Sequence, residues 1–263
     1  MEVSRSGYYG WRGRSASARE KANEGLLEQI REIHRLRRQV YGSPRMHLEL
    51  KAQGFLCGRH RVARLMQKHG IEAKVTRRFR MACQARGTAP AASNWLLRGM
   101  IANRPNGQWV SDMTFIPTRS GWLYLAVLMD LYSRRIVGWA MSARRTSQLV
   151  CEALWMAIRQ RRPVPGTILH SDQGAQYKSE EYQRLLKEHG LICSMSRKGN
   201  CYDNAAMESF FHTLKTELVW FEDYSTREVA KTSLFEYIEA FYNRIRRHSS
   251  LHYLSPMQYE LQV

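Results

Sequence analysis

Long hydrophobic runs are absent from the 263-residue sequence, and their absence argues against a membrane protein. A membrane-spanning helix needs about 20 consecutive apolar residues. The longest apolar run here, residues 122–129, stops at Asp130. The N-terminal segment Met-Glu-Val-Ser-Arg-Ser also lacks the apolar core of a secretion signal. We therefore expect an intracellular protein with no membrane partner.

Cysteine is scarce, and its placement gives no sign of pairing. The five cysteines, at positions 57, 83, 151, 193 and 201, are odd in number and form no C-x-x-C pair. A disulfide framework uses an even number of cysteines, and a structural zinc site uses closely spaced pairs. The sequence therefore predicts reduced thiols and a cytoplasmic location. A hydrophobic content of 44% and an aromatic content of 11% argue against disorder.

Acidic residues are few relative to basic ones, and the imbalance is concentrated near the N-terminus. The chain has 41 Lys and Arg against 23 Asp and Glu, a formal net charge of +18. Residues 1–107 contain 22 basic and 7 acidic residues, so they carry +15 of this charge. A polyanion is the expected partner, because phosphates neutralised by Lys and Arg release condensed counterions. A basic surface of the ribosomal-protein kind is the alternative, and charge alone does not separate an enzyme from a binding protein.

The N-terminal part has the periodicity of three helices. The spacing of apolar residues predicts helices over residues 17–41, 44–52 and 59–69, with Ser43 as the N-cap of the second. Three short helices with a basic last helix are typical of a helix-turn-helix module, although a solvated helical hairpin has the same pattern. Residues 74–107 lose this periodicity and are predicted to form a basic linker. Four residues of the third helix are candidates for contacts to DNA phosphates: Arg59, Arg61, Arg64 and Lys68.

From residue 108 onward, strand patterns replace the helical ones. Three β-rich runs separated by short turns predict an antiparallel meander, and strands then alternate with helices, as in an α/β sheet layered with helices. The predicted strands are residues 108–117, 122–130, 135–141, 167–170 and 191–194, and the predicted helices are residues 147–161, 179–189, 203–221 and 226–247. Three tryptophans, Trp109, Trp122 and Trp139, are expected to lie in the core.

Three carboxylates stand at positions where a charge needs an explanation. Asp112 lies in a strand that is apolar on both faces, where an ionised group is costly without a cation or good hydrogen bonds. Asp172 follows a short apolar strand, at the end where α/β sheets bind ligands, although turn residues are also common there. His170, two residues earlier, either bonds to Asp172 or is an ordinary core histidine. Glu208 shares a polar helical stripe with Lys215, and that stripe can equally be a solvated helix face.

Together, the three carboxylates and their surroundings resemble the D-D-E signature of transposases and retroviral-type integrases, with 35 residues between Asp172 and Glu208. The segments that carry the resemblance are Trp109-Val-Ser-Asp-Met-Thr, His170-Ser-Asp-Gln-Gly-Ala-Gln-Tyr, Ser196-Arg-Lys-Gly-Asn-Cys-Tyr-Asp-Asn-Ala-Ala-Met-Glu-Ser-Phe-Phe and Tyr242-Asn-Arg-Ile-Arg-Arg-His-Ser-Ser-Leu-His-Tyr-Leu-Ser-Pro. Upstream, Tyr41-Gly-Ser-Pro-Arg-Met-His and Arg61-Val-Ala-Arg-Leu-Met resemble the helix-turn-helix of the same proteins. Over nearly its whole length the chain is similar to integrase-core transposases of bacterial two-frame insertion sequences, of the orfB type.

This resemblance implies a fold and a division into domains. The implied fold is a ribonuclease H-like integrase catalytic core of the α/β class, preceded by a small all-α helix-turn-helix domain. The implied domains are a DNA-binding domain at residues 1–73, a basic linker at 74–107 and a catalytic core with C-terminal helices at 108–263. A bacterial, nucleoid-associated location is implied as well.

The resemblance also implies a reaction. Asp112, Asp172 and Glu208 would be the catalytic residues and would bind two Mg²⁺ or Mn²⁺ ions, since carboxylate oxygens suit hard divalent cations. Two such ions activate the attacking hydroxyl and stabilise the leaving oxygen, so no covalent protein–DNA intermediate is expected. The enzyme would cleave at the ends of the insertion sequence and join the freed 3′-hydroxyl to another strand. Further candidates for DNA contacts are Lys215, Arg197 and Lys198.

The implied partners are double-stranded DNA, as terminal inverted repeats and as target, and further copies of the chain on that DNA. Family members typically gain an additional helix-turn-helix and a leucine zipper from an upstream frame by frameshifting. The sequence contains neither, so we expect a fragment of the full transposase, with the upstream-frame product as a candidate partner. A non-enzymatic DNA-binding regulator of transposition is the alternative function, and a nuclease acting on RNA–DNA hybrids is a third.

One position departs from the family pattern. His252 stands where the tail usually has glycine. A positive φ at this position would strain a histidine more than a glycine. Local strain in the tail is therefore expected if the backbone turns there as it does in the family.

Overall fold

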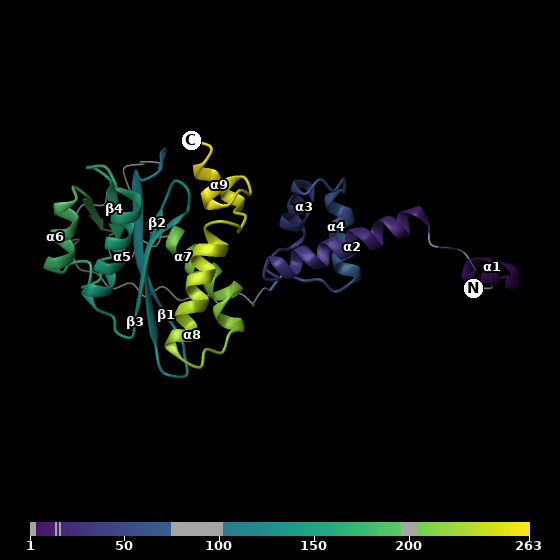
Figure 1. The fold of residues 1–263 in the computed structure, drawn as a ribbon, viewed down its shortest axis with the longest axis horizontal. Coiled ribbons are helices and arrows are strands. Elements are labelled where there is room, and N and C mark those ends of the chain that lie inside the picture. Colours follow the sequence, from purple (N-terminus) through teal and green to yellow (C-terminus); the bar gives the residue numbers. More distant parts are fainter. Residues whose placement is uncertain (1–3, 14, 16, 75–101, 196–204) are drawn as a thin grey trace. The chain divides into compact units, whose positions relative to one another are not determined.

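The computed structural model describes residues 4–13, 15, 17–74, 102–195 and 205–263 (Figure 1). The chain divides into two compact units, Met1–Val75 and Thr76–Val263, which we describe one at a time. Most of the predicted basic linker lies outside the described residues, as do the candidate DNA-contact residues Arg197 and Lys198.

The first unit is helical. It contains α1 (Arg5–Arg12), α2 (Ala18–Leu36), α3 (Ser43–Ala52) and α4 (Arg59–Lys68), and the last three contact one another. The residues at their shared core are Leu26, Ile30, Ile33, Met46, Leu50, Val62, Leu65 and Met66. The predicted three-helix module is confirmed, because the apolar residues that gave the helical periodicity are the ones that meet in this core. The N-cap of α3 is Gly42, whereas the predicted cap, Ser43, is the first helical residue.

Helix α2 is shorter than predicted. It begins as expected after Ser17, whose hydroxyl accepts a hydrogen bond from a backbone N–H of the first turn. It ends at Leu36 and not near residue 41, because Arg38 and Gln39 have φ values of 56° and 62°. A left-handed backbone cannot continue a right-handed helix, and the sequence carries no glycine there to signal the turn.

The second unit is built on a mixed sheet of five strands. The strands are β1 (Gln108–Ile116), β2 (Leu123–Asp130), β3 (Ile136–Ser142), β4 (Ile168–Ser171) and β5 (Ile192–Met195). Their order is β3-β2-β1-β4-β5. The first three strands form the predicted antiparallel meander, and β4 and β5 continue the sheet in parallel with β1. The predicted α/β class is therefore confirmed.

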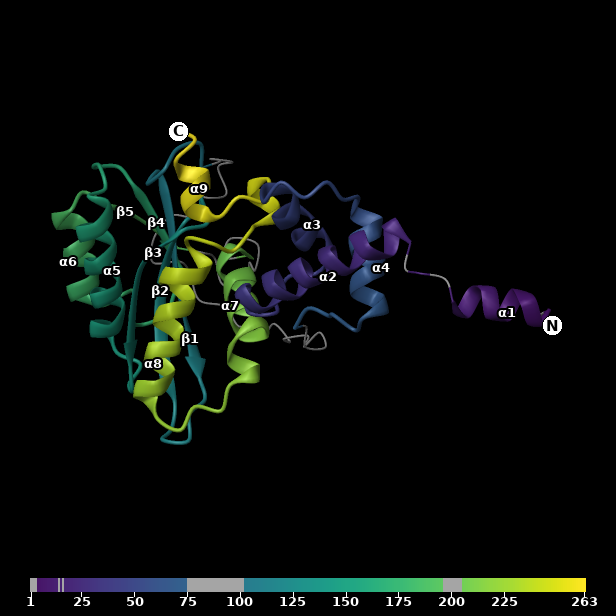
Figure 2. The same cartoon turned by 45° about the vertical axis from the view of Figure 1, so that its right-hand side comes forward.

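Helices cover both faces of this sheet (Figures 1 and 2). One face carries α5 (Ser147–Arg161) and α6 (Glu180–Glu188), and the other carries α7 (Ala205–Glu217) and α8 (Arg227–Phe235). Helix α5 lies very close to β3, where a Cβ atom on Gly138 would come within 2.3 Å of the backbone oxygen of Ala153. Glycine at this position allows the helix to pack directly on the strand.

The two long C-terminal helices predicted from the sequence are both interrupted. Helix α7 is followed by a 3₁₀ turn, Val219–Phe221, and α8 continues as a π-helical turn, Glu236–Tyr242. The next residue, Asn243, uses its side-chain amide to bond the backbone N–H (2.9 Å) and C=O (3.0 Å) of Ile136 in β3. Strand β3 is an edge strand, so this amide satisfies backbone groups that would otherwise need a further strand or water.

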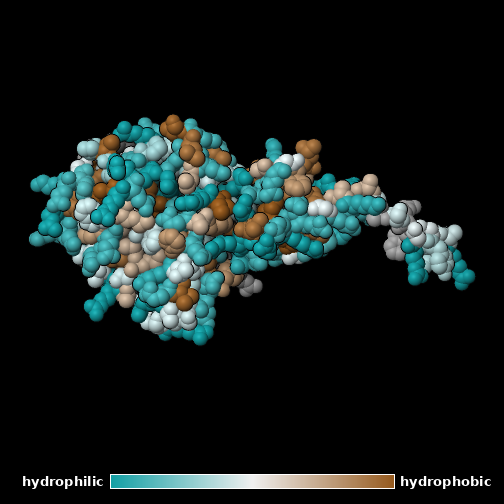
Figure 3. Space-filling model, in the orientation of Figure 1, coloured by the Kyte–Doolittle hydropathy of each residue, from teal (hydrophilic) through white to brown (hydrophobic). Residues whose placement is uncertain are grey.

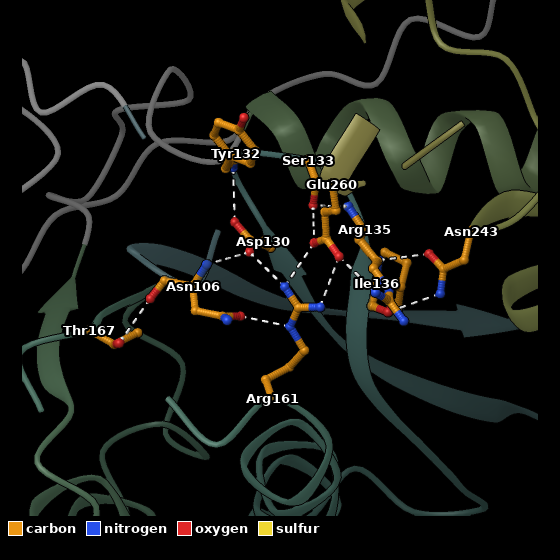
Figure 4. A network of polar contacts seen from close by, with 10 residues as sticks. All are labelled: Asn106, Asp130, Tyr132, Ser133, Arg135, Ile136, Arg161, Thr167, Asn243 and Glu260. Atoms are coloured by element: carbon orange, nitrogen blue, oxygen red, sulfur yellow. Dashed lines mark hydrogen bonds and ion pairs between the residues drawn. The ribbon is translucent and has the colours of Figure 1, made fainter. Parts of the chain in front are cut away.

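The last helix, α9 (Pro256–Glu260), is tied to the sheet and to α5 by a polar network (Figure 4). The Glu260 carboxylate accepts hydrogen bonds from both terminal nitrogens of Arg161, at 2.9 and 2.8 Å. Asp130, at the end of β2, accepts hydrogen bonds from the backbone N–H groups of Asn106 (2.7 Å) and Tyr132 (2.9 Å). Burial raises the pKa of Asp130 to about 6. These contacts assign Asp130 a structural role.

The positive φ considered for His252 is confirmed. The residue follows a 3₁₀ turn, Ser249–Leu251, with a φ of 51°, and Tyr253 after it has a φ of 62°. The His252 side chain is exposed, so few contacts offset the strain of the left-handed backbone.

Replacement of His252 with glycine is expected to raise the free energy of unfolding by about 0.5–1 kcal/mol. Relief of left-handed strain outweighs the larger backbone freedom that glycine has in the unfolded chain. Urea titrations of the wild type, His252→Gly and His252→Ala measure the effect. The alanine variant keeps the Cβ atom and should show no gain; a His252→Gly variant no more stable than His252→Ala would contradict the explanation.

The surfaces of both units are mostly hydrophilic on the face visible in Figure 3, with hydrophobic residues in small separate groups. No helix in the described parts of the chain is long and apolar enough to cross a membrane. Trp109 is fully buried and Trp139 partly buried. The expectation of a core position is wrong for Trp122, which is 50% exposed. It lies in the connection between β1 and β2, not within a strand.

Candidate active site

Asp112 and Asp172 lie at neighbouring positions of the sheet, Asp112 within β1 and Asp172 directly after β4. Strands β1 and β4 pair in parallel as far as Ser111 and Ser171, so the next residue of each segment is one of the two aspartates. Side chains alternate between the faces of a sheet, which places Asp112 on the face opposite the α5–α6 core. That is the face covered by α7 (Figures 1 and 2).

The pair lies where the sheet narrows. Strand β4 ends at Ser171, whereas β1 continues to Ile116, so β1 has no β4 neighbour from Asp112 onward. Both aspartates are partly exposed at this step. The site therefore combines side chains fixed by regular strands with access for a ligand from the open side.

Short-range hydrogen bonds orient both carboxylates. The Oδ1 atom of Asp172 accepts a bond from the backbone N–H of Gly174 at 2.9 Å. A Cβ atom on Gly174 would lie 2.9 Å from that same oxygen, so a larger residue there would shift the Asp172 carboxylate. The Oδ1 atom of Asp112 accepts a bond from the backbone N–H of Met113 at 2.7 Å.

A buried tyrosine lies beneath the two aspartates. Tyr177 is fully buried, and its hydroxyl oxygen lies 3.3 Å from the hydroxyl oxygen of Ser111. Burial raises the pKa of Tyr177 well above its usual value, and the negative charges of Asp112 and Asp172 raise it further. The hydroxyl therefore stays neutral beneath the carboxylates. Tyr177 closes the segment His170–Tyr177 that carried the resemblance, but nothing else in the sequence marks it as a residue of the site.

His170 lies in the core. It is fully buried in β4, and its Nδ1 atom is 2.9 Å from the hydroxyl oxygen of Ser194 in β5. Of the two interpretations considered for His170, the core histidine is the one that this hydrogen bond supports.

Glu208, the third predicted carboxylate, lies in the first turn of α7 and is exposed. Within the described residues, no three His, Cys, Asp or Glu side chains lie close enough together to hold a metal ion. The structure thus brings Asp112 and Asp172 together but does not add Glu208 to them as a ready three-ligand cluster.

Lys215, two turns further along α7, brings a positive charge to the same place. Its ammonium nitrogen lies 5.0 Å from the centre of the Phe115 ring on β1. Burial lowers the pKa of Lys215, and the nearby negative charge of Asp112 partly opposes that shift. A cation beside a carboxylate pair suits a site for phosphate.

The basic residues of α4 fall into two groups. Arg59, Arg64 and Lys68 are exposed, as expected for residues that contact DNA. Arg61 is partly buried, and its Nε atom donates a hydrogen bond to the Asn23 side chain of α2 at 2.8 Å. Asn23 and Arg61 are 38 positions apart in the chain, so the helical pattern of the sequence could not predict this contact.

A mixed sheet of this order, with helices on both faces and aspartates on the first strand and after the fourth, is the architecture of an integrase catalytic core. The family of integrase core domains matches residues 102–201, a second integrase core family matches residues 208–263, and the family of HTH-like domains matches residues 20–79. The described fold and these matches agree on a helix-turn-helix-like domain followed by an integrase core.

Individual relatives narrow the assignment. The chain is 42% identical to the transposase InsF of insertion sequence IS3A from Escherichia coli strain K12, over 99% of this chain and 91% of that protein. It is 44% identical to the 31 kDa protein of insertion element IS600 from Shigella sonnei, over 97% and 93% of the two chains. Its fold resembles that of a chain in the intasome of simian T-cell lymphotropic virus, solved in complex with the PP2A regulatory subunit B56 gamma. The TM-score is 0.50 and the sequence identity 16%, over 88% of this chain and 74% of that chain. The chain belongs to the integrase-core transposases of the IS3 family of insertion sequences.

Family membership makes the protein a transposase, an enzyme that transfers polynucleotide strands and binds DNA. It favours the enzyme over the non-enzymatic regulator considered from the sequence. The catalytic residues and the metal requirement are inferred from the geometry of the site and not from family membership.

Proposed function

We propose that the protein cleaves DNA at the ends of an insertion sequence and then joins the freed 3′-hydroxyl to another strand in a reaction that requires divalent metal ions. The observation that carries this proposal is the position of Asp112 and Asp172, each one residue beyond the last β1–β4 pair, with the ammonium group of Lys215 near Asp112. Two partly exposed carboxylates and a nearby cation suit a phosphodiester and its counterions better than they suit an apolar substrate.

The residues fit a hard divalent cation. Asp112 and Asp172 are partly exposed and offer carboxylate oxygens, which Mg²⁺ and Mn²⁺ prefer as ligands. Glu208 would be the third ligand and would have to approach the pair from the first turn of α7. Two bound ions would polarise the phosphodiester and stabilise the attacking and leaving oxygens.

The side chains of the protein would position the DNA. Lys215 would hold the phosphate next to the scissile bond, and Arg197 and Lys198 are proposed as further phosphate contacts. The nucleophile would be water in the first step and a DNA 3′-hydroxyl in the second, so no covalent protein–DNA intermediate forms. Strand transfer of two ends requires both to be held at once, and we therefore propose that several copies assemble on the DNA, together with the upstream-frame product where it is made.

The experiment is a cleavage and joining assay with terminal-repeat DNA of the element and the full chain. With Mg²⁺ or Mn²⁺ we expect nicked products with a free 3′-hydroxyl and joined products with target DNA, and none of them in the presence of EDTA. DNA that stays covalently attached to protein on a denaturing gel, or unchanged activity in EDTA, would contradict the proposal.

We further propose that α4 contacts DNA phosphates through its three exposed basic residues. Changing Arg59, Arg64 and Lys68 together to glutamine should reduce the slope of log K against log salt concentration by about 2–3, since each phosphate contact contributes roughly 0.9. Binding titrations at several salt concentrations measure the slope. Arg35→Gln, a matched change on α2 where the side chain pairs with Glu32, should leave it unchanged; equal effects of the two variants would place the DNA elsewhere.

A further inference from the structure

Two large aromatic side chains remain exposed beside the candidate active site. Phe115 is 52% exposed and Trp122 is 50% exposed. Their rings meet edge to face, with centroids 5.0 Å apart. Phe115 lies three residues beyond Asp112 on β1, and Trp122 lies just before β2 in the connection between the two strands. Exposed aromatic groups of this size at a site commonly mark a binding surface.

The aromatic pair is continuous with the charged part of the site. Lys215 contacts the face of Phe115 with its ammonium nitrogen 5.0 Å from the ring centre, and it also interacts with Asp112. Asp112 and Phe115 project from opposite faces of β1, and Lys215 lies near both of them. A carboxylate, an ammonium group and two aromatic rings therefore lie near the edge of β1 that has no β4 neighbour. This set matches a nucleotide, in which a phosphate is joined to an aromatic base.

The exposed position of Trp122 is built into the fold. The backbone N–H of Arg119 donates to the carbonyl oxygen of Tyr224 at 2.9 Å. On the same connection, Arg227 donates from Nε to the carbonyl oxygen of Trp122 at 3.0 Å and from its backbone N–H to the Ser120 hydroxyl at 3.2 Å. These bonds hold the β1–β2 connection against the segment before α8, so the backbone that carries Trp122 is fixed before any ligand arrives. A rigid surface loses less conformational entropy on binding.

We propose that Phe115 and Trp122 stack on an unpaired base of the DNA strand whose phosphate lies at Asp112 and Lys215. A base inside a duplex has both faces covered by its neighbours, whereas a terminal or unpaired base offers a free face to an aromatic side chain. Stacking of this kind tolerates any base, because every base has a π face. The inference rests on the proposed function in one respect, which is the placement of the scissile phosphate at Asp112.

The test uses terminal-repeat DNA in which 2-aminopurine replaces, one at a time, each base next to the cleavage site. Fluorescence is recorded on binding of the full chain in EDTA, so that no reaction occurs. We expect a change at one position with the wild type and its loss with Trp122→Leu and Phe115→Leu. The conservative variants Trp122→Phe and Phe115→Tyr should keep the signal. In the joining assay, the two leucine variants should be slower by about ten-fold or more.

Trp155→Leu is the matched control, because Trp155 is 44% exposed on α5 and its ring packs against His189, with centroids 5.2 Å apart. It should behave as the wild type, and thermal unfolding should show that all variants are folded. A signal that survives both leucine changes, or that Trp155→Leu also removes, would overturn the proposal. The signal needs no catalysis, so a protein that stacks the base but fails to react with any metal would contradict the proposed function and not the stacking.

Discussion

Asp112→Asn and Asp172→Asn should each lower the rate of strand transfer by on the order of 10³-fold or more. A metal-bound site contributes several kcal/mol of transition-state stabilisation, and about 1.4 kcal/mol corresponds to a factor of ten. Asparagine keeps the side-chain oxygen that accepts the backbone N–H of Met113 or Gly174, so the local turn is retained. The loss should therefore appear in the reaction and not in folding. Rates on pre-cleaved terminal-repeat DNA measure it.

Glu208→Gln, which changes the third carboxylate, should lower the rate of strand transfer to a similar extent. Its side chain is exposed, so the fold should not depend on it. Glu222→Gln is the matched control, since Glu222 is an exposed acid of the same unit outside the site. Terminal-repeat DNA binding should be kept by all of these variants. Wild-type rates for Asp112→Asn or Asp172→Asn would contradict the assignment of the active site. Full activity of Glu208→Gln would show that Glu208 is not part of that site.

Arg246→Met should lower the free energy of unfolding by about 3–5 kcal/mol. Arg246 is buried and makes a two-bond ion pair with Glu217, from Nε to Oε2 at 2.7 Å and from Nη2 to Oε1 at 2.6 Å. The Tyr237 hydroxyl donates to the same carboxylate at 2.8 Å. Removing the arginine leaves a buried charge without its ion partner, which is strongly destabilising. Urea unfolding of the full chain measures the change.

This ion pair joins the C-terminal tail to the end of α7, the helix that carries Glu208 and Lys215. Arg244→Met is the matched control, because Arg244 is exposed two residues earlier, and it should change stability by less than about 0.5 kcal/mol. The double variant Arg246→Met/Glu217→Leu should recover part of the loss, since it removes both charges together. Equal stability of Arg246→Met and Arg244→Met would contradict this role.

The arrangement of the sheet could be predicted from the sequence because its signals are local. Apolar runs in residues 108–141 marked the three strands of the meander, and the short run before Asp172 marked β4. Parallel pairing of β4 with β1 then brings Asp112 next to Asp172. The resemblance supplied the grouping of these carboxylates, because neither charge is a strong signal alone.

Long-range contacts explain most of what the sequence did not predict. The ion pair of Arg246 and Glu217 spans 29 positions, and nothing in a helical pattern reveals such a partner. The exposure of Trp122 depends on how the β1–β2 connection is held by Arg227, 105 positions further on. Tyr177 gains its place beneath the aspartates only when the turn after β4 brings it to Ser111.

The central claim is that Asp112 and Asp172 form the metal-dependent site at which a DNA 3′-hydroxyl attacks a phosphodiester. The most direct measurement compares joining of pre-cleaved terminal-repeat DNA that ends in a 3′-hydroxyl with joining of the same DNA lacking that hydroxyl. We predict joined product only from the hydroxyl-ended DNA, only with Mg²⁺ or Mn²⁺, and none with Asp172→Asn. Joined product from DNA without the 3′-hydroxyl, or from the Asp172→Asn protein at the wild-type rate, would contradict the claim.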